Sequence, residues 1–261
     1  MKPDFSEFSY GYAVTEELVS SLKAALVGAP IFPSLYEEGK SGGGYDLKLP
    51  VAGTPIFLQF KLSDQLERSN AKEHRDGLMP LPYYRMHLRP TKHSDQHNLL
   101  LALEASGEAV YYIAPEFHLP AELNAHYLAK TVVPNSAAFT PSSIGPLPTV
   151  DEHYVVFSRH STTAYRCSSN PKQIRKITLG TEIRADLTER GFKARELNDQ
   201  SYRDLANRMV GALAQTEERL KARAKSIDVE GTRRIVQLRE PIESISYMAR
   251  TFFDAELLIL E

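Results

Sequence analysis

The spacing of apolar and polar residues predicts a helix followed by strands in the first part of the chain. Apolar residues recur at helical spacing over 15–27, and Gly28 with Pro30 ends this segment. The mainly apolar segment 55–62, PIFLQFKL, follows a turn and predicts a strand. A shorter strand is expected over 45–50, so the two strands can form a hairpin.

The rest of the chain predicts an α/β fold, in which a mixed sheet is flanked by helices. We expect a core over 1–175 and a mainly helical C-terminal region over 176–261, packed on the core or on a partner. The polar, basic stretch 61–92 is either a phosphate-binding flank or a solvated loop or helix face. The further predicted elements are a helix from Ser94 to Gly107, strands at 110–114, 154–158 and 162–167, and helices at 199–226 and 241–254.

Composition excludes several classes of protein. The 261 residues carry a formal net charge of -2, so any nucleic-acid-binding surface must be local. The single cysteine, Cys167, allows no intramolecular disulfide and fits a reducing compartment. The N-terminal segment does not read as a secretory signal, and no apolar run is long enough to span a membrane. We therefore expect a cytoplasmic protein.

The residues that indicate chemistry lie around the predicted hairpin. Asp46 follows three glycines, and the next strand carries Gln59 and Lys61. Side chains alternate along a strand, so Gln59 and Lys61 project to one side, and the hairpin can bring Asp46 beside them. Hydrolysis of a phosphodiester at such a site needs a divalent ion, and Mg²⁺, the usual choice, is held by oxygen ligands. It also needs a cationic side chain that stabilises the negative charge developing on the phosphate. The alternative is an ordinary hairpin with a solvated Asp and an exposed Lys amine.

The segments GGGYDLKL and IFLQFK resemble the catalytic segment of PD-(D/E)xK nucleases, and most closely that of Mrr-type restriction endonucleases. The resemblance covers roughly residues 15–115 and implies a restriction-endonuclease-like core. It implies that Asp46 is a metal ligand, that Gln59 occupies the second motif position and also contacts the metal, and that Lys61 is the catalytic lysine. Glu37 and Glu38 are candidates for an additional acid, with Glu38 as a further metal ligand.

One departure separates the chain from nucleases related to RecB, which carry a Gln and a Tyr four residues apart on the following helix. Here Gln96 is followed four positions later by Leu100. The helix that Ser94 opens should lie over the sheet near the Gln-x-Lys strand. Gln96, on the apolar face of this helix, should point toward the core beside the site and is a candidate for nucleic-acid contact. Arg85, Arg89 and Lys92 are candidates for phosphate contact, the alternative being a solvated surface.

These expectations favour a Mg²⁺-dependent endonuclease, with Mn²⁺ as a possible substitute, that cleaves DNA in a bacterial restriction or phage-defence setting. A non-catalytic nucleic-acid-binding or scaffold subunit is the main alternative, and an RNA-cleaving toxin is a third. No sequence-reading module is recognisable, so activity is expected to depend on a homo-oligomer or a partner subunit. The amphipathic segments of 195–261 either pack on their own domain or supply that contact surface.

Overall fold

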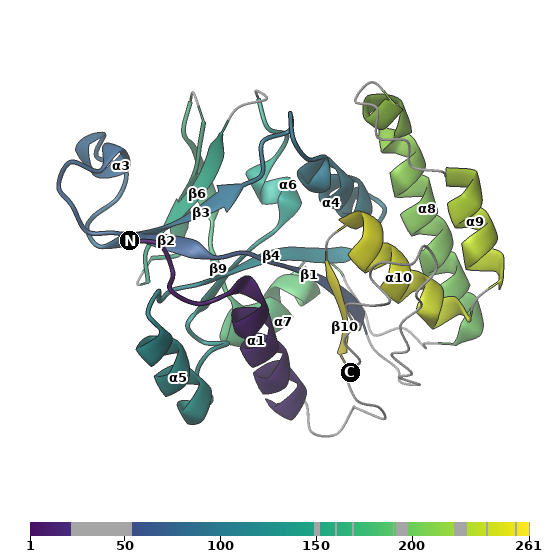
Figure 1. Cartoon of the computed structure of the whole chain (residues 1–261), viewed down its shortest axis with the longest axis horizontal. Coiled ribbons are helices and arrows are strands. Elements are labelled where there is room, and N and C mark those ends of the chain that lie inside the picture. Colours follow the sequence, from purple (N-terminus) through teal and green to yellow (C-terminus); the bar gives the residue numbers. More distant parts are fainter. Residues whose placement is uncertain are drawn as a thin grey trace. The chain divides into compact units, whose positions relative to one another are not determined.

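In the computed structural model, the described residues form an α/β fold with two five-stranded sheets (Figure 1). It describes residues 1–21, 54–148, 152–159, 161–168, 170–189, 191, 198–221, 229–238, 240–253 and 255–260. The chain forms two compact units. The first comprises Met1–Ser21, Gln59–His97 and Tyr111–Gly191, and the second comprises, over its described parts, 54–58, 98–110 and 198–260. The division expected near residue 175 stays a prediction.

The first sheet is mixed and has the strand order β10-β1-β4-β5-β9. Its central strand β4 is buried along its whole length, as expected for an uninterrupted apolar run. The strand predicted at 110–114 is thereby confirmed. The bounds are β1 Thr54–Phe60, β4 Ala109–Pro115, β5 Ser136–Phe139, β9 Ile177–Thr178 and β10 Glu256–Leu260.

The second sheet is antiparallel and has the order β2-β3-β6-β7-β8. Pairing of Tyr154 with Cys167 and of Phe157 with Ala164 confirms the predicted strand pair β6–β7. The bounds are β2 Ser63–Leu66, β3 Tyr83–Leu88, β6 His153–Phe157, β7 Thr163–Cys167 and β8 Lys172–Arg175.

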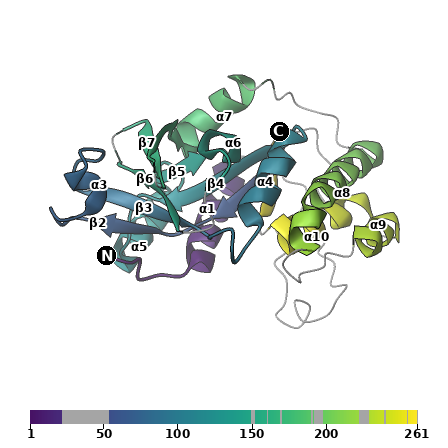
Figure 2. The same cartoon turned by 90° about the horizontal axis from the view of Figure 1, so that it is seen from above.

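Helices precede, separate and follow these strands in the chain (Figure 2). The part of the chain that the structure describes holds no helix long and apolar enough to cross a membrane. The bounds are α1 Glu7–Ser21, α3 Lys72–Arg75, α4 Gln96–Ala105, α5 Pro120–Ala129, α6 Pro141–Ile144, α7 Leu179–Glu189, α8 Asp199–Lys221, α9 Val229–Leu238 and α10 Pro241–Phe253.

Helix α1 begins at Glu7, so the predicted start at Thr15 is wrong. The Ser6 hydroxyl accepts a hydrogen bond from Ser9 N (3.0 Å) and caps the helix. Gly11 allows a close approach to the sheet, because a Cβ atom at this position would lie 3.1 Å from the ring of Phe60. Tertiary packing and this cap therefore decide where the helix begins.

Strands β2 and β3 and the helix α3 lie in the stretch 61–92, where no strand was predicted beyond residue 62, so this stretch is not a single solvated loop or helix face. Strand β2 reads SDQL and has no apolar run, yet its residues pair with β3 from Ser63↔Met86 to Leu66↔Tyr83. Backbone pairing, rather than apolar pattern, forms this strand.

The C-terminal apolar residues lie within their own unit. Ile242, Ile245 and Met248 of α10 are buried, and α10 lies against α8 and α9. The apolar tail forms β10, which pairs antiparallel with β1 from Thr54↔Leu260 to Leu58↔Glu256. These apolar residues of α10 are therefore covered by helices of their own unit, and the contact of this region with a partner stays a prediction.

Candidate functional site

Gln59 and Lys61 lie where β1 ends, and both are buried, with exposed fractions of 2% and 6%. Phe60 between them meets the ring of Tyr10 of α1 edge-on, with 6.1 Å between centroids. Backbone contact with β4 continues past the strand end, because Lys61 N donates to Ile113 O (2.9 Å). Phe60 thus faces α1 and, by the alternation of strand residues, Gln59 and Lys61 face away from it.

The side chain of Gln59 is held by the first turn of α4. Gln96 Nε2 donates to Gln59 Oε1 (2.9 Å), and Gln59 Nε2 donates to the Phe60 carbonyl (2.9 Å). Gln96 N donates in turn to the Ser94 hydroxyl (3.2 Å), as expected for a capping serine. The expectation that this helix begins beside the Gln-x-Lys strand is confirmed by the Gln59–Gln96 contact.

This arrangement places an amide oxygen and a buried ammonium group on one strand face. The side-chain carbonyl oxygen of Gln59 has two lone pairs, and one accepts the hydrogen bond from Gln96. The second lone pair can coordinate a cation. Burying the Lys61 ammonium costs free energy unless anionic or hydrogen-bonding groups surround it. Asp95, a buried carboxylate that directly precedes Gln96 in the chain, is a further candidate residue of this site, and the sequence analysis did not name it.

Asp46, Glu37 and Glu38 lie outside the described residues, so their predicted roles stay predictions. Within the described ranges, no group of three His, Cys, Asp or Glu side chains is placed to hold a metal ion. Binding of a metal ion by carboxylates, as predicted, therefore depends on Asp46 together with Glu37 or Glu38.

The three basic candidates lie in different surroundings. Arg85 of β3 donates from Nη2 to Glu73 Oε2 (2.5 Å), and its guanidinium lies 5.1 Å from the centre of the Tyr154 ring. Burial alone would raise the pKa of the Glu73 carboxyl, but hydrogen bonds from Tyr83 and Arg85 outweigh it and leave that pKa below its usual value. Arg89 and Lys92 are exposed. A phosphate would compete with Glu73 for Arg85, and Arg89 and Lys92 lie at the surface.

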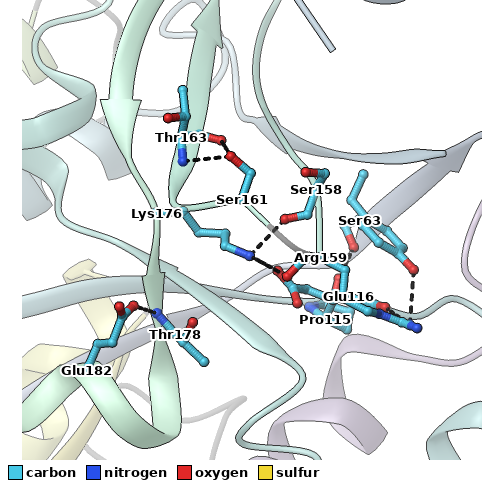
Figure 3. A network of polar contacts seen from close by, with 11 residues as sticks. Ser63, Pro115, Glu116, Ser158, Arg159, Ser161, Thr163, Lys176, Thr178 and Glu182 are labelled. Carbon is cyan, nitrogen blue, oxygen red and sulfur yellow. Dashed lines mark hydrogen bonds and ion pairs between the residues drawn. The ribbon is translucent and has the colours of Figure 1, made fainter. Parts of the chain in front are cut away.

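A second polar cluster surrounds a buried ion pair between Lys176 and Glu116 (Figure 3). Their side chains are 3% and 5% exposed, and Lys176 Nζ lies 2.5 Å from Glu116 Oε1. Lys176 Nζ also donates to the carbonyl oxygens of Ser158 (2.8 Å) and Arg159 (3.2 Å). All three ammonium hydrogens therefore have acceptors, which is the arrangement expected of a structural ion pair.

Arg159 completes this cluster. Its Nη2 donates to the Glu116 carbonyl (2.5 Å) and to the Tyr84 hydroxyl (3.3 Å). The sequence analysis missed the cluster, although Glu116 directly follows the apolar strand β4 and Lys176 precedes the short strand β9. A charged residue at the end of a fully buried strand was the available signal.

His97 is a buried, hydrogen-bonded histidine next to Gln96. Its Nε2 donates to Gly145 O (2.9 Å), and its Nδ1 accepts from the Tyr112 hydroxyl (3.0 Å) in the neutral ring. Burial lowers the pKa of His97 to about 4, and the charges of His153 and Arg166 act in the same direction. The imidazole is therefore neutral at pH 7 and is more plausible as a packing element than as a proton-transfer group.

Acidification should weaken the fold through His97. Because its pKa is lower in the folded than in the unfolded chain, the unfolded chain binds the extra proton between the ordinary His pKa and about 4. The free energy of unfolding should fall by about 2 kcal/mol from pH 7 to pH 5 through this group. Urea unfolding at both pH values checks this, with His97→Gln as the control. An equal pH dependence in the variant contradicts the assignment.

Comparison with family models, with curated proteins and with solved structures finds no match to this chain.

Proposed function

We propose that the chain is a metal-dependent nuclease with a PD-(D/E)xK-type site on a restriction-endonuclease-like core. One observation supports this most: Gln59 and Lys61 are buried together at the end of β1, and Gln96 of α4 fixes the Gln59 amide. A buried, oriented Gln and Lys two residues apart are unusual in a merely structural hairpin, where the Lys amine would extend into solvent.

The roles follow from the chemistry of each side chain. Asp46, with Glu38 or Glu37, would hold Mg²⁺ or Mn²⁺, and Gln59 would add a neutral oxygen. The ion would polarise the phosphate and activate water. Lys61 would stabilise the negative charge that develops on the phosphate oxygens, and its burial strengthens that interaction.

The proposed substrate is DNA, in a bacterial restriction or phage-defence setting in the cytoplasm, with activity that depends on assembly. The test is to incubate the purified chain with plasmid, linear DNA, single-stranded DNA and RNA, each with Mg²⁺, Mn²⁺ or EDTA. Cleavage that requires the metal supports the proposal, and cleavage of RNA alone favours the toxin alternative. Cleavage that persists in EDTA contradicts the metal-dependent site.

A second candidate, a non-catalytic nucleic-acid-binding or scaffold subunit, is favoured by the neutral residue at position 59. Gln59 carries no charge, and its oxygen already accepts a hydrogen bond from Gln96. A site that has lost its metal would retain this geometry.

Mn²⁺ titration by calorimetry separates the two candidates. For the nuclease, wild type should bind Mn²⁺, Asp46→Asn should not, and Gln59→Glu should bind more tightly because it adds a negative charge at the same oxygen position. Gln59→Leu is the control that removes the oxygen while keeping an apolar stem. Equal heats for wild type and Asp46→Asn would favour the scaffold.

Arg89 and Lys92 should set the salt dependence of nucleic-acid binding. If each contacts one phosphate, Arg89→Gln and Lys92→Gln should each reduce the slope of log affinity against log salt by about 0.9 for duplex DNA. Fluorescence anisotropy at several salt concentrations measures this, and Arg175→Gln, at an exposed arginine of β8, is the control. An unchanged slope in both variants would make this stretch a solvated surface.

A further inference from the structure

The most exposed large apolar side chains among the described residues all lie in the first unit. The large hydrophobic side chains that are most exposed among the described residues all belong to the N-terminal segment, to α1, or to α5 and its N-cap. They are Met1, Phe8, Tyr12, Leu119 and Leu128. Phe8 and Leu128 are 69% and 72% exposed. Exposed apolar side chains that lie together mark interaction sites, whereas single scattered ones do not.

Helix α5 shows the same feature over its whole length. None of its ten residues is buried, although its sequence, PAELNAHYLA, is mostly apolar or small. Its outward residues carry no charge before the helix ends: Ala121, Asn124, Ala125, Leu128 and Ala129. A surface helix normally presents a polar face to water, so this composition indicates a covered surface.

Helices α1 and α5 lie side by side and run in the same direction (Figures 1 and 2). The rings of Tyr12 and Tyr127 are 6.4 Å apart, and one turn further Lys130 Nζ lies 2.6 Å from Glu16 Oε2. We call this surface the α1–α5 face and define it by Phe8, Tyr12, Tyr127, Leu128 and the exposed small residues of α5.

The charges on this face argue against a polyanionic partner. Lys130, at its C-terminal end, is paired with Glu16, and the N-terminal end carries Asp4, Glu7 and Glu122. A nucleic acid or an anionic lipid surface needs clustered unpaired cations.

The helix dipoles indicate which protein surface fits. Since α1 and α5 are parallel and Asp4 N donates to His118 O just before both helices begin, their positive N-terminal ends lie together, and the negative C-terminal end of α5 lies beside Glu16 of α1. A second copy of the same face, rotated by a twofold axis to run antiparallel, places N-terminal ends against C-terminal ends. It also places the acidic end with Glu7 near Lys130 of the second copy.

We propose that the α1–α5 face is the interface of a symmetric homodimer, in which Phe8 of each copy lies against Leu128 of the other. Such an interface is self-complementary, as twofold dimers require. The proposal does not depend on nuclease activity, because it rests on exposure and charge alone.

The test uses the full chain and measures mass by light scattering over a range of protein concentrations. Wild type should approach twice 29.3 kDa as concentration rises. Phe8→Glu and Leu128→Lys should each remain monomeric, because each brings a charge into the apolar contact of both copies. Both side chains are exposed, so folding should persist, as circular dichroism checks. Ala125→Arg, which blocks the face by bulk, provides a second disruptive variant.

Gln173→Lys at an exposed position of β8 adds the same charge elsewhere and should dimerise like wild type. Mixing Phe8→Glu with Leu128→Lys should restore the dimer, since one contact becomes a Glu–Lys pair and the other is wild type. A wild type that stays monomeric, or disruptive variants that still dimerise, overturns the proposal. Failure of the mixed pair to associate overturns the antiparallel arrangement.

Discussion

Replacing Lys176 with methionine should lower the free energy of unfolding by about 3–5 kcal/mol. The substitution keeps most of the apolar stem but removes the ammonium group, so the Glu116 carboxylate, 5% exposed, loses the cation 2.5 Å away. Two carbonyl oxygens, of Ser158 and Arg159, lose a donor as well. An unpaired buried charge is among the most destabilising defects known in proteins. Urea unfolding followed by circular dichroism measures the loss.

The neighbouring residue supplies a matched control. Arg175 also forms an ion pair, with Glu189 at 3.0 Å, but both side chains are more than half exposed. Arg175→Met should therefore have a small effect, because solvent screens such pairs. The double variant Lys176→Met with Glu116→Gln should recover part of the loss, since the buried negative charge is gone. A Lys176→Met protein as stable as Arg175→Met would show that the pair is not structural.

Lys61→Met should reduce metal-dependent cleavage at least about 100-fold, the effect of removing one preorganised group that stabilises transition-state charge. The apolar stem of Lys61 is retained, and its backbone contact with Ile113 does not involve the side chain. The fold should therefore persist in circular dichroism. Initial rates of plasmid nicking at saturating Mg²⁺ measure the effect.

The control for this variant is Lys72→Met, which removes an exposed lysine of α3 and should leave the rate unchanged. Asp46→Ala should reproduce the loss seen for Lys61→Met if both act in one site. Cleavage at the wild-type rate by Lys61→Met would remove this lysine from the mechanism.

Periodic or continuous apolar patterns predicted several elements of the fold. The apolar run of β4, the β6–β7 pair and the long helices α8 and α10 were all predicted from such patterns. The strands β2 and β8 read SDQL and KQIR and were missed. They lie at the two edges of the second sheet, where neighbouring backbone decides the structure.

The candidate site was predictable in part for a related reason. Strand alternation implies that Gln59 and Lys61 share a face, and the apolar face of the following helix placed Gln96 near them. Glu116 at the end of β4 signals a buried charge, but its partner Lys176 could not be predicted, since 60 residues separate the two and only the folded chain brings them together. The exposure of Phe8 and Leu128 could not be predicted either, because it is known only from the folded structure.

The pairing of β1 with β10 has a consequence for the order of events during synthesis. Residues 54–58 leave the ribosome long before residues 256–260, with which they pair. Until then, one edge of the strand that leads to Gln59 has unpaired backbone groups, a known site for wrong association between chains. The nascent chain therefore cannot complete its first sheet by local contacts, and this late closure is expected to slow folding. A cell would then hold an incompletely formed candidate site on each chain until translation has passed residue 260.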